Sequence, residues 1–191
     1  MSYPILIQVL FPTLWIAWLI YWWVSARNVK ETRWQEPLGS QLLHRVPLLL
    51  GALLFAAPRL LPLALRRRLL PLGPLAPTVG VLLIAAGLGF SVWARRHLGR
   101  NWSSQVVVKA DHALVRSGPY SRLRHPIYTG LLLAFLGTAV IIGEVRGFLA
   151  FVPLLISFAI KSRAEEARMR ETFPEYEGYR RETAALIPYV F

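Results

Sequence analysis

The chain has no cysteine and is poor in acidic residues. Its 191 residues include 10 aspartates and glutamates against 22 lysines and arginines, which gives a formal net charge of +12 at pH 7. The absence of cysteine excludes disulfides, thiolate metal ligands and a cysteine nucleophile. The four histidines, His44, His97, His112 and His125, lack the short spacing of a metal site, so no metal is indicated.

The sequence also lacks the composition of a soluble domain. Hydrophobic residues make up 55% of it and fall into long runs. In a soluble protein the positive charge would suggest a nucleic-acid partner. Here the basic residues cluster in short connections beside apolar runs, as the positive-inside rule describes. We therefore interpret the charge as a sign of membrane topology and of contact with anionic membrane lipids, and expect no nucleic acid.

The apolar runs predict the number of membrane spans. A helix needs about 17 to 25 apolar residues to cross the bilayer, and the chain offers about five runs, at residues 3–24, 42–65, 75–94, 127–142 and 145–160. Prolines interrupt the far half of the second run, while the last two runs are short and separated only by Gly143 and Glu144. The sequence predicts an all-α integral membrane protein of about five transmembrane helices, including a C-terminal helical hairpin that need not cross fully.

The third apolar run is rich in small residues, among them Gly80, Gly87 and Gly89. Small side chains let the backbones of neighbouring membrane helices approach closely. We expect a helix–helix contact along this run.

The basic residues predict the orientation. If the polar segments around residues 101–125 and 161–191 share one side, an odd number of crossings puts the N-terminus on the other. Lysines and arginines on the first side then number four in residues 27–45, seven in 95–124 and six in 161–181, against five elsewhere. This bias predicts a cytoplasmic C-terminus, in a prokaryotic inner membrane if the compact size is a guide. The first run lacks the form of a cleaved signal peptide, so we expect it to remain as a span. This topology places the cluster Arg66, Arg67 and Arg68 on the non-cytoplasmic side of the membrane. Either the second run is re-entrant or the cluster serves another purpose.

The polar segment NWSSQVVVKADHALVRSGPYSRLRHPIYTG, residues 101–130, is the first candidate for a site. Pro126 fits the first turn of a helix, where its missing N–H costs nothing, so the fourth helix is predicted to begin there. Arg124 and His125 then lie just before the first turn of this helix, and His125 and Tyr128 share one helix face. The preceding SGPY turn brings Tyr120 close to them. A helix start can receive a carboxylate or phosphate. Anchoring at the membrane interface by the same residue types is an equally open alternative.

The second polar segment, KSRAEEARMRETFPEYEGY at residues 161–179, adds carboxylates. As a helix leaving the bilayer it would present Glu165 and Glu166 beside Arg124. Ordinary i,i+4 ion pairs on a solvated helix, such as Lys161 with Glu165, are the alternative interpretation. Acids this close to a membrane edge are costly and tend to be functional.

Together the two segments resemble the isoprenylcysteine carboxyl methyltransferase and phospholipid methyltransferase superfamily of integral membrane enzymes. The matching stretches are LVRSGPYSRLRHPIYTG and EEARMRETFPEYEGYRRETAALIP, and the resemblance spans about residues 75–191. It implies that S-adenosylmethionine binds to cytosolic segments near the C-terminus, while a lipophilic methyl acceptor enters from the bilayer. It also implies one methyltransferase domain over residues 1–191, with variable N-terminal spans at 1–70 and a catalytic core at 75–191.

The resemblance assigns roles to individual residues. It places Lys161 where eukaryotic relatives carry a substrate-contacting arginine, with Arg163 two residues further on, and either could serve. The implied cofactor contacts are Gln105, His112, Ala113, Leu114, Val115, Tyr120, His125, Pro126, Ile127, Tyr128 and Glu165. The candidate catalytic and acceptor-binding residues are Arg124, Lys161, Arg163 and Glu166.

These residue types suit methyl transfer from a sulfonium. The faces of Tyr120 and Tyr128 can hold the cation, with about 1 to 2 kcal/mol for a desolvated cation–π contact, and Glu165 can hold the ammonium or ribose hydroxyls. An anionic acceptor needs a cation beside it, whereas an amine must first be neutral, which makes His125 or Glu166 a candidate base. The excess of cations mildly favours an anionic acceptor or a phosphate-bearing lipid.

The sequence thus predicts S-adenosylmethionine-dependent methyl transfer to a lipophilic, membrane-associated acceptor, of the isoprenylcysteine carboxyl O-methyltransferase type. A phospholipid-headgroup N-methyltransferase and a methyltransferase for a small thiol or other hydrophobic metabolite remain open. The alternatives of another class are an NADPH-dependent enzyme like the sterol reductases and a non-catalytic lipid-binding protein.

Overall fold

The computed structural model describes residues 3–27, 32–99, 102, 107–109 and 114–187. The helices are α1 (Tyr3–Ser25), α2 (Leu38–Ala56), α3 (Leu75–Leu98), α4 (Pro126–Ile142), α5 (Val145–Thr172) and α6 (Tyr176–Glu182), with short 3₁₀ turns η1 (Pro58–Leu60), η2 (Leu63–Arg66) and η4 (Gly118–Ser121). Two short strands, β1 (Thr32–Gln35) and β2 (Val107–Lys109), complete the elements.

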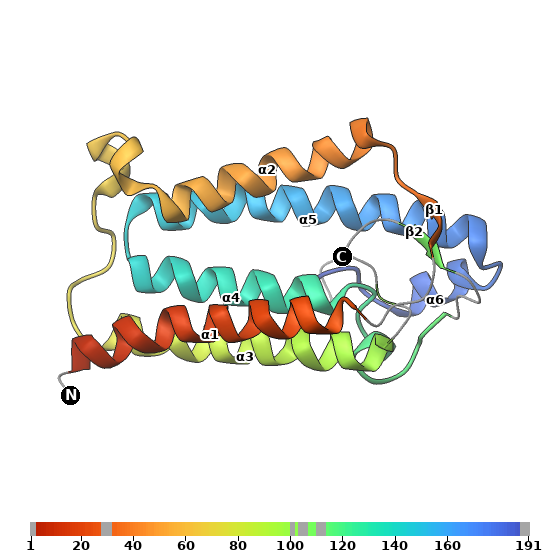
Figure 1. Ribbon diagram of the computed structural model, residues 1–191, viewed down its shortest axis with the longest axis horizontal. Helices are drawn as coiled ribbons and strands as arrows, with labels where there is room; N and C mark the ends of the chain where they lie inside the picture. The colour runs from red at the N-terminus through yellow and green to blue at the C-terminus, as the bar shows by residue number, and fades with distance from the viewer. Residues whose placement is uncertain (1–2, 28–31, 100–101, 103–106, 110–113, 188–191) are drawn as a thin grey trace.

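Helices α1 to α5 lie along one another in alternating directions (Figure 1). Four helices of the described part of the chain are long and apolar enough to cross a membrane: α2, α3, α5 and residues 8–25 of α1; α4 is a shorter apolar helix. Large apolar side chains such as Leu19, Leu43 and Leu82 are exposed on the outside of the bundle, as lipid-facing residues would be. The prediction of an all-α multi-pass membrane protein is confirmed.

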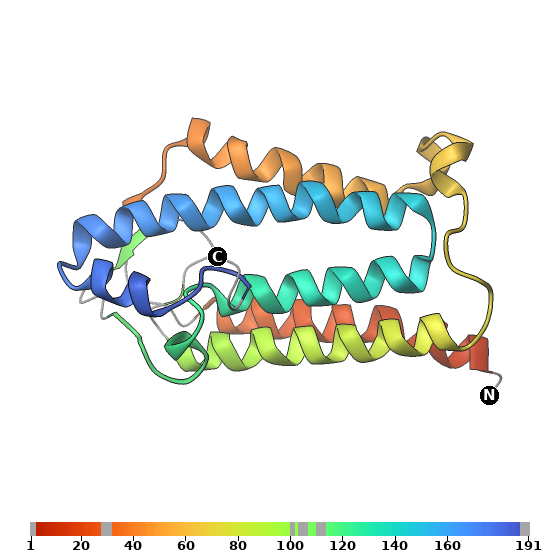
Figure 2. The ribbon, with the colours of Figure 1, turned by 180° about the vertical axis from the view of Figure 1, so that it is seen from behind.

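The second and fifth helices differ in length from the predicted spans. α2 ends at Ala56 instead of continuing to residue 65, because Pro58 and Pro62 remove backbone donors and the chain forms 3₁₀ turns there. α2 runs antiparallel beside α5 along the bundle, so it is not re-entrant (Figures 1 and 2). α5 continues past the predicted residue 160 to Thr172 and carries the second polar segment on the same helix.

The closest helix contact is between α3 and α4, as the small residues of the third run predict. A Cβ on Gly87 would lie 2.4 Å from the carbonyl oxygen of Gly130, and one on Gly80 would lie 2.7 Å from that of Gly137. A side chain at these positions would therefore collide with backbone. α2 approaches α5 in the same way at Gly51, where a Cβ would lie 2.6 Å from Leu154 Cγ.

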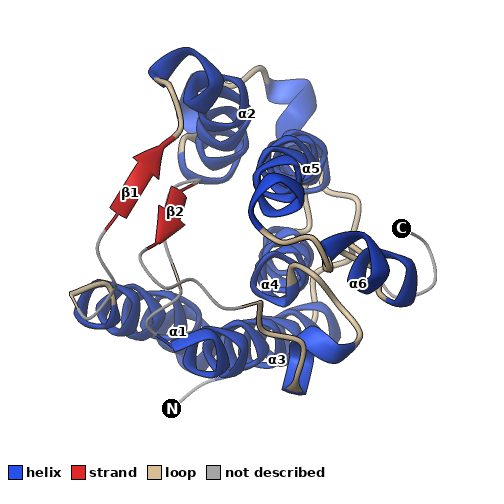
Figure 3. Ribbon diagram, turned by 90° about the vertical axis from the view of Figure 1, so that its right-hand side faces the viewer, coloured by secondary structure: helices blue, strands red, loops and turns tan. Residues whose placement is uncertain are grey.

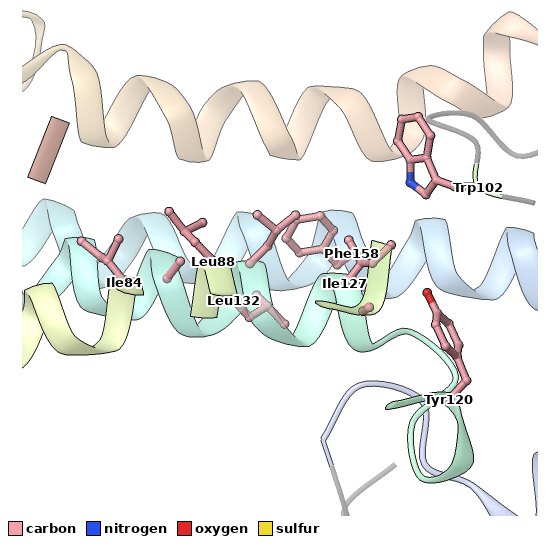
Figure 4. Packing of buried hydrophobic residues seen from close by; sticks show 10 residues of the cluster. Ile84, Leu88, Trp102, Tyr120, Ile127, Leu132 and Phe158 are labelled. Atoms are coloured by element: carbon pink, nitrogen blue, oxygen red, sulfur yellow. The ribbon is translucent and has the colours of Figure 1, made fainter. Parts of the chain in front are cut away.

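The largest buried cluster fills the space between α3, α4 and α5. Figure 4 shows Ile84, Leu88, Leu132 and Phe158 facing one another within it. α1 joins through hydrogen bonds as well as apolar contact, because Trp18 Nε1 donates to Ser91 Oγ at 2.8 Å. This bond pairs two polar atoms of neighbouring membrane helices with each other.

Arginines cap helix ends at the opposite end of the bundle from the polar segments. The Arg146 guanidinium donates to the carbonyl oxygens of Leu54 (3.0 Å) and Phe55 (2.6 Å), which end α2, and pairs with Glu144. Arg68 donates to the carbonyl oxygen of Ile142 at the end of α4, at 3.5 Å. Helix carboxyl ends favour cations, so Arg68 has a capping purpose that the sequence left open.

The polar segments gather at the other end, beside the β1–β2 ribbon and α6 (Figure 3). The two strands pair antiparallel, with Gln35 opposite Val107. This ribbon was not foreseen from the sequence. It joins the start of α2 to the connection between α3 and α4.

Candidate active site

The start of α4 is held in place by a later part of the chain. Pro126 is the first residue of α4 and His125 lies just before it, as predicted. The backbone N–H groups of Arg124 and His125 donate to the carbonyl oxygens of Ala184 (2.9 Å) and Ala185 (3.0 Å). The segment after α6 therefore lies along the entry to α4 and fixes the position of His125.

His125, Tyr128 and the two acids of α5 form one buried group, which we call the His125–Glu165 cluster. The Tyr128 hydroxyl donates to Glu165 Oε1 at 2.6 Å. His125 Nδ1 lies 3.3 Å from Glu165 Oε2, and its Nε2 lies 3.2 Å from Glu166 Oε1. The side chains of His125 and Glu165 are 9% and 19% exposed. The two polar segments thus meet where the sequence predicts it.

The cluster favours the charged form of His125. Burial lowers the pKa of this imidazole, but hydrogen bonds and charge attraction from Glu165 and Glu166 raise it by more, so the net pKa is above its usual value. A protonated imidazole donates from both nitrogens. His125 in this state holds the two carboxylates and is not available as a base.

Arg124 stabilises the same group of residues through hydrogen bonds. Its Nε donates to Glu166 Oε1 at 2.7 Å, and its Nη1 donates to the carbonyl oxygens of Arg180, at 3.0 Å, and Thr183. The side chain is buried. These contacts connect α5 to α6 and to the residue that follows it, and they occupy much of the guanidinium that was predicted to hold an acceptor.

Aromatic rings continue the cluster into the bundle. The His125 ring is stacked on Tyr128 at 5.5 Å between centroids, and Tyr128 is stacked on Phe158 at 5.0 Å. Lys161 Nζ lies 5.5 Å from the centroid of the Tyr128 ring, so a cation already lies against this face. Phe158 was missed in the sequence, although it lies three residues before Lys161 and seven before Glu165, a spacing that places all three on one helix face.

The start of α4 offers fewer free donors than expected. The N–H groups of Tyr128 and Thr129 both donate to the carbonyl oxygen of His125, at 3.0 and 3.1 Å. Pro126 has no N–H. The side chains of the cluster are therefore better placed than this helix start to bind a charged ligand.

The other predicted residues lie around the cluster or apart from it. Tyr120 is buried, and its hydroxyl is directed toward Trp102 (Figure 4). Its carbonyl oxygen accepts a hydrogen bond of 2.7 Å from the hydroxyl of Tyr179. Burial raises the pKa of Tyr179 to about 12, although Arg124 and Arg116 oppose the shift. Tyr179 therefore stays protonated and keeps this bond.

The remaining predicted contacts divide into three groups. Leu114 packs against the small cluster of Phe173 and its tyrosine neighbours, while Val115 and Ile127 belong to the main apolar cluster. Arg163 is exposed on α5, unlike Lys161. Gln105, His112 and Ala113 lie outside the described residues.

Residues 75–176 match the phospholipid methyltransferase family. This stretch is more than half of the chain and contains the whole His125–Glu165 cluster. The chain belongs to this family. Its members are membrane methyltransferases that generally use S-adenosylmethionine.

This chain is similar to several curated proteins. It is 31% identical over 120 residues to protein-S-isoprenylcysteine O-methyltransferase of Saccharomyces cerevisiae, covering 61% of this chain and 50% of the relative. It is 35% identical over 117 residues to the cobalt-zinc-cadmium resistance protein CzcN of Cupriavidus metallidurans, covering 58% and 51%. The chain spans about half the length of these curated relatives.

A solved structure supports the fold. The eukaryotic intramembrane Ras methyltransferase ICMT (isoprenylcysteine carboxyl methyltransferase) superposes with a TM-score of 0.56 at 18% identity, covering 77% of this chain and 52% of that one. At this identity the likeness concerns the fold, which is therefore ICMT-like.

Proposed function

We propose that this protein transfers a methyl group from S-adenosylmethionine to a lipophilic acceptor in the membrane, at the His125–Glu165 cluster. The observation that carries the proposal is the buried contact of Tyr128 with Glu165 at 2.6 Å, within the stretch that matches the methyltransferase family. A carboxylate and an aromatic face then lie side by side where two polar segments meet.

The residues present fit the cofactor. A sulfonium beside an amino acid and a nucleoside needs an aromatic ring and a carboxylate, and Tyr128 and Glu165 supply the two in direct contact. Glu165 would hold the ammonium or the ribose hydroxyls, and Tyr120 and Tyr128 would face the sulfonium. Bound there, S-adenosylmethionine supplies a methyl group that is already activated for transfer. The contacts expected from Gln105, from residues 112–115 and from residues 126–127 belong to the same proposal.

The chain contributes positioning and exclusion of water. His125, Tyr128 and Phe158 form a stacked and largely buried row, and Arg124 holds Glu166 and the end of α6 around it. Holding two reactants in a reactive geometry can supply roughly 7 to 11 kcal/mol of the barrier reduction. A dedicated base is then not needed for an acceptor that reacts as an anion.

We assign acceptor contact to Lys161 before Arg163. Lys161 lies against Tyr128, whereas Arg163 is exposed on the outside of α5. The carboxyl acceptor named for one group of relatives, a headgroup amine and a small thiol are all compatible with this arrangement. We place the cluster on the cytoplasmic side, and assign residues 1–70 to acceptor choice and 75–191 to the catalytic core.

The cofactor site is tested by calorimetry of S-adenosylmethionine binding to detergent-solubilised protein. Glu165→Gln keeps an acceptor for the Tyr128 hydroxyl but removes the charge, so we expect binding at least about tenfold weaker, roughly 1.4 kcal/mol. Glu171→Gln, an exposed acid on the same helix, is the matched control and should bind as the unmodified protein does. Equal affinity of the Glu165→Gln variant and the control would refute the site.

A further inference from the structure

A second buried polar group lies at the start of α2, outside the residues that match the family. We call Glu36, Gln41 and His44 the α2 polar cluster; they are 4%, 2% and 6% exposed. The Glu36 carboxylate accepts a hydrogen bond from the Ser40 hydroxyl through Oε1, and its Oε2 lies 3.1 Å from His44 Nε2. A carboxylate has about four lone-pair positions, so Glu36 can accept further donors.

Gln41 carries a buried acceptor that is left without a donor. Its Nε2 donates to the carbonyl oxygen of Glu36 at 2.7 Å, which fixes the orientation of the amide, since only the nitrogen can donate to a carbonyl. Its Oε1 is buried and has no hydrogen-bond partner among the residues that the structure describes. Buried polar atoms in folded proteins nearly always have a partner. This oxygen is an acceptor that a ligand with an N–H or O–H group would satisfy.

The α2 polar cluster lies at the level of the candidate active site. The Ser157 hydroxyl of α5 donates to the carbonyl oxygen of His44 at 2.7 Å, which sets the register of these antiparallel helices. Glu36 precedes His44 by eight residues and Glu165 follows Ser157 by eight, so the two residues lie at about the same height along these antiparallel helices.

We propose that the α2 polar cluster binds the polar group of the methyl acceptor and selects acceptors whose polar group carries an N–H or O–H donor. This inference rests on the proposed function for the location of methyl transfer. The cluster presents a carboxylate and an unpaired amide oxygen, both of which accept hydrogen bonds. A carboxylate acceptor would bring a like charge to Glu36 and no donor for Gln41.

The test uses direct binding of three short-chain phospholipids in the absence of S-adenosylmethionine. Phosphatidylethanolamine offers N–H donors, phosphatidylglycerol offers O–H donors, and phosphatidylcholine offers neither. Calorimetry of the solubilised protein should show at least one donor-bearing lipid binding fivefold or more tightly than phosphatidylcholine. The lipid that binds more tightly tells whether the donor is an amine or a hydroxyl. Equal binding of all three would overturn the proposal.

Variants show whether the cluster causes the preference. Gln41→Met has nearly the same shape and removes the unpaired oxygen together with the Nε2 donor to the Glu36 carbonyl oxygen. The lipid preference should therefore disappear, and the lost hydrogen bond should lower the thermal unfolding midpoint. Glu36→Gln should reduce binding of the amine lipid more than that of the hydroxyl lipid. Ser157→Ala removes one hydrogen bond between α2 and α5 and leaves the side chains of the cluster in place, so this variant should keep the preference.

A purely structural role gives a different pattern. Gln41→Met would then lower the unfolding midpoint and leave the lipid preference intact, and this outcome would overturn the proposal. Because lipid binding is measured without the cofactor, it is independent of the result for Glu165→Gln. If lipid selection is normal and Glu165→Gln binds S-adenosylmethionine with unchanged affinity, the proposed function is refuted and the role of the α2 polar cluster in lipid binding is not.

Discussion

His125 lies between the carboxylates of Glu165 and Glu166, and its charge determines how firmly these acids are held. The folded-state pKa is raised because the attraction of the two acids exceeds the cost of burial. The stability gained from this charge is complete below the unfolded pKa of about 6.5. It is lost as the pH rises through the higher folded-state value.

This linkage predicts a pH-dependent effect of His125→Gln. The variant should be less stable than the unmodified protein below about pH 6.5, and the difference should shrink as the pH rises past the folded-state pKa. Thermal unfolding of both proteins in one detergent, followed across this range, measures it. A difference that grows toward alkaline pH would contradict the assigned charge.

The sequence anticipated part of the site at this scale. His125 and Tyr128 are three residues apart at a proline-marked helix start, so their common face follows from helix geometry. Glu165 and Glu166 stand out because acids at a membrane edge are costly. The contacts of Arg124 with carbonyl oxygens at the end of α6 could not be foreseen, because backbone partners more than fifty residues away leave no mark in the side-chain pattern.

At the scale of helices, the α3–α4 contact depends on glycine. Gly87 faces the backbone of Gly130, whereas a Cβ on Gly89, two residues along the same helix, would meet nothing within 4 Å. The sequence showed both as small residues of one run and could not separate them. Which glycine faces the neighbour is decided by the rotation of α3 about its axis.

The two glycines give a matched pair of substitutions. Gly87→Ala should destabilise the protein by about 1 to 3 kcal/mol, because the added methyl group overpacks a backbone contact. Gly89→Ala should be neutral or slightly stabilising, since alanine is the better helix former. Denaturation of both variants in mixed micelles compares them, and equal effects would contradict the packing.

The bounds of α2 and the β1–β2 ribbon show where sequence patterns fail for whole elements. The apolar run continued to residue 65, but hydrophobicity does not say whether a proline-rich stretch stays helical, and α2 ends at Ala56. The ribbon pairs residues about 75 apart through backbone hydrogen bonds. Such pairing leaves little trace in a strand of three or four residues.

At the scale of the whole molecule, the two ends of the bundle differ in chemistry. One end holds the His125–Glu165 cluster and the α2 polar cluster, and the other holds the arginines that cap α2 and α4. The family match begins at α3 and reaches the start of α6, so α1 and α2 lie outside it.

The charge bias predicts the orientation of this bundle. Reporter proteins fused after residue 191 should be active in the cytoplasm, and those fused before residue 1 should be active outside. The physical reason is that 17 of the 22 lysines and arginines fall on the first side by the division of segments made from the sequence. A cytoplasmic N-terminal reporter would mean that the bundle is inserted the other way or with a different number of crossings.

The pairing of residues 184 and 185 with the entry to α4 has a consequence for biosynthesis. When the last long helix has left the ribosome, every side chain of the His125–Glu165 cluster has been synthesised. The backbone N–H groups of Arg124 and His125 still lack their carbonyl acceptors at that point. The proposed methyl-transfer activity should therefore appear late, after all hydrophobic helices have entered the bilayer and the following segment has folded back. Until then, partly made chains would be inserted but inactive.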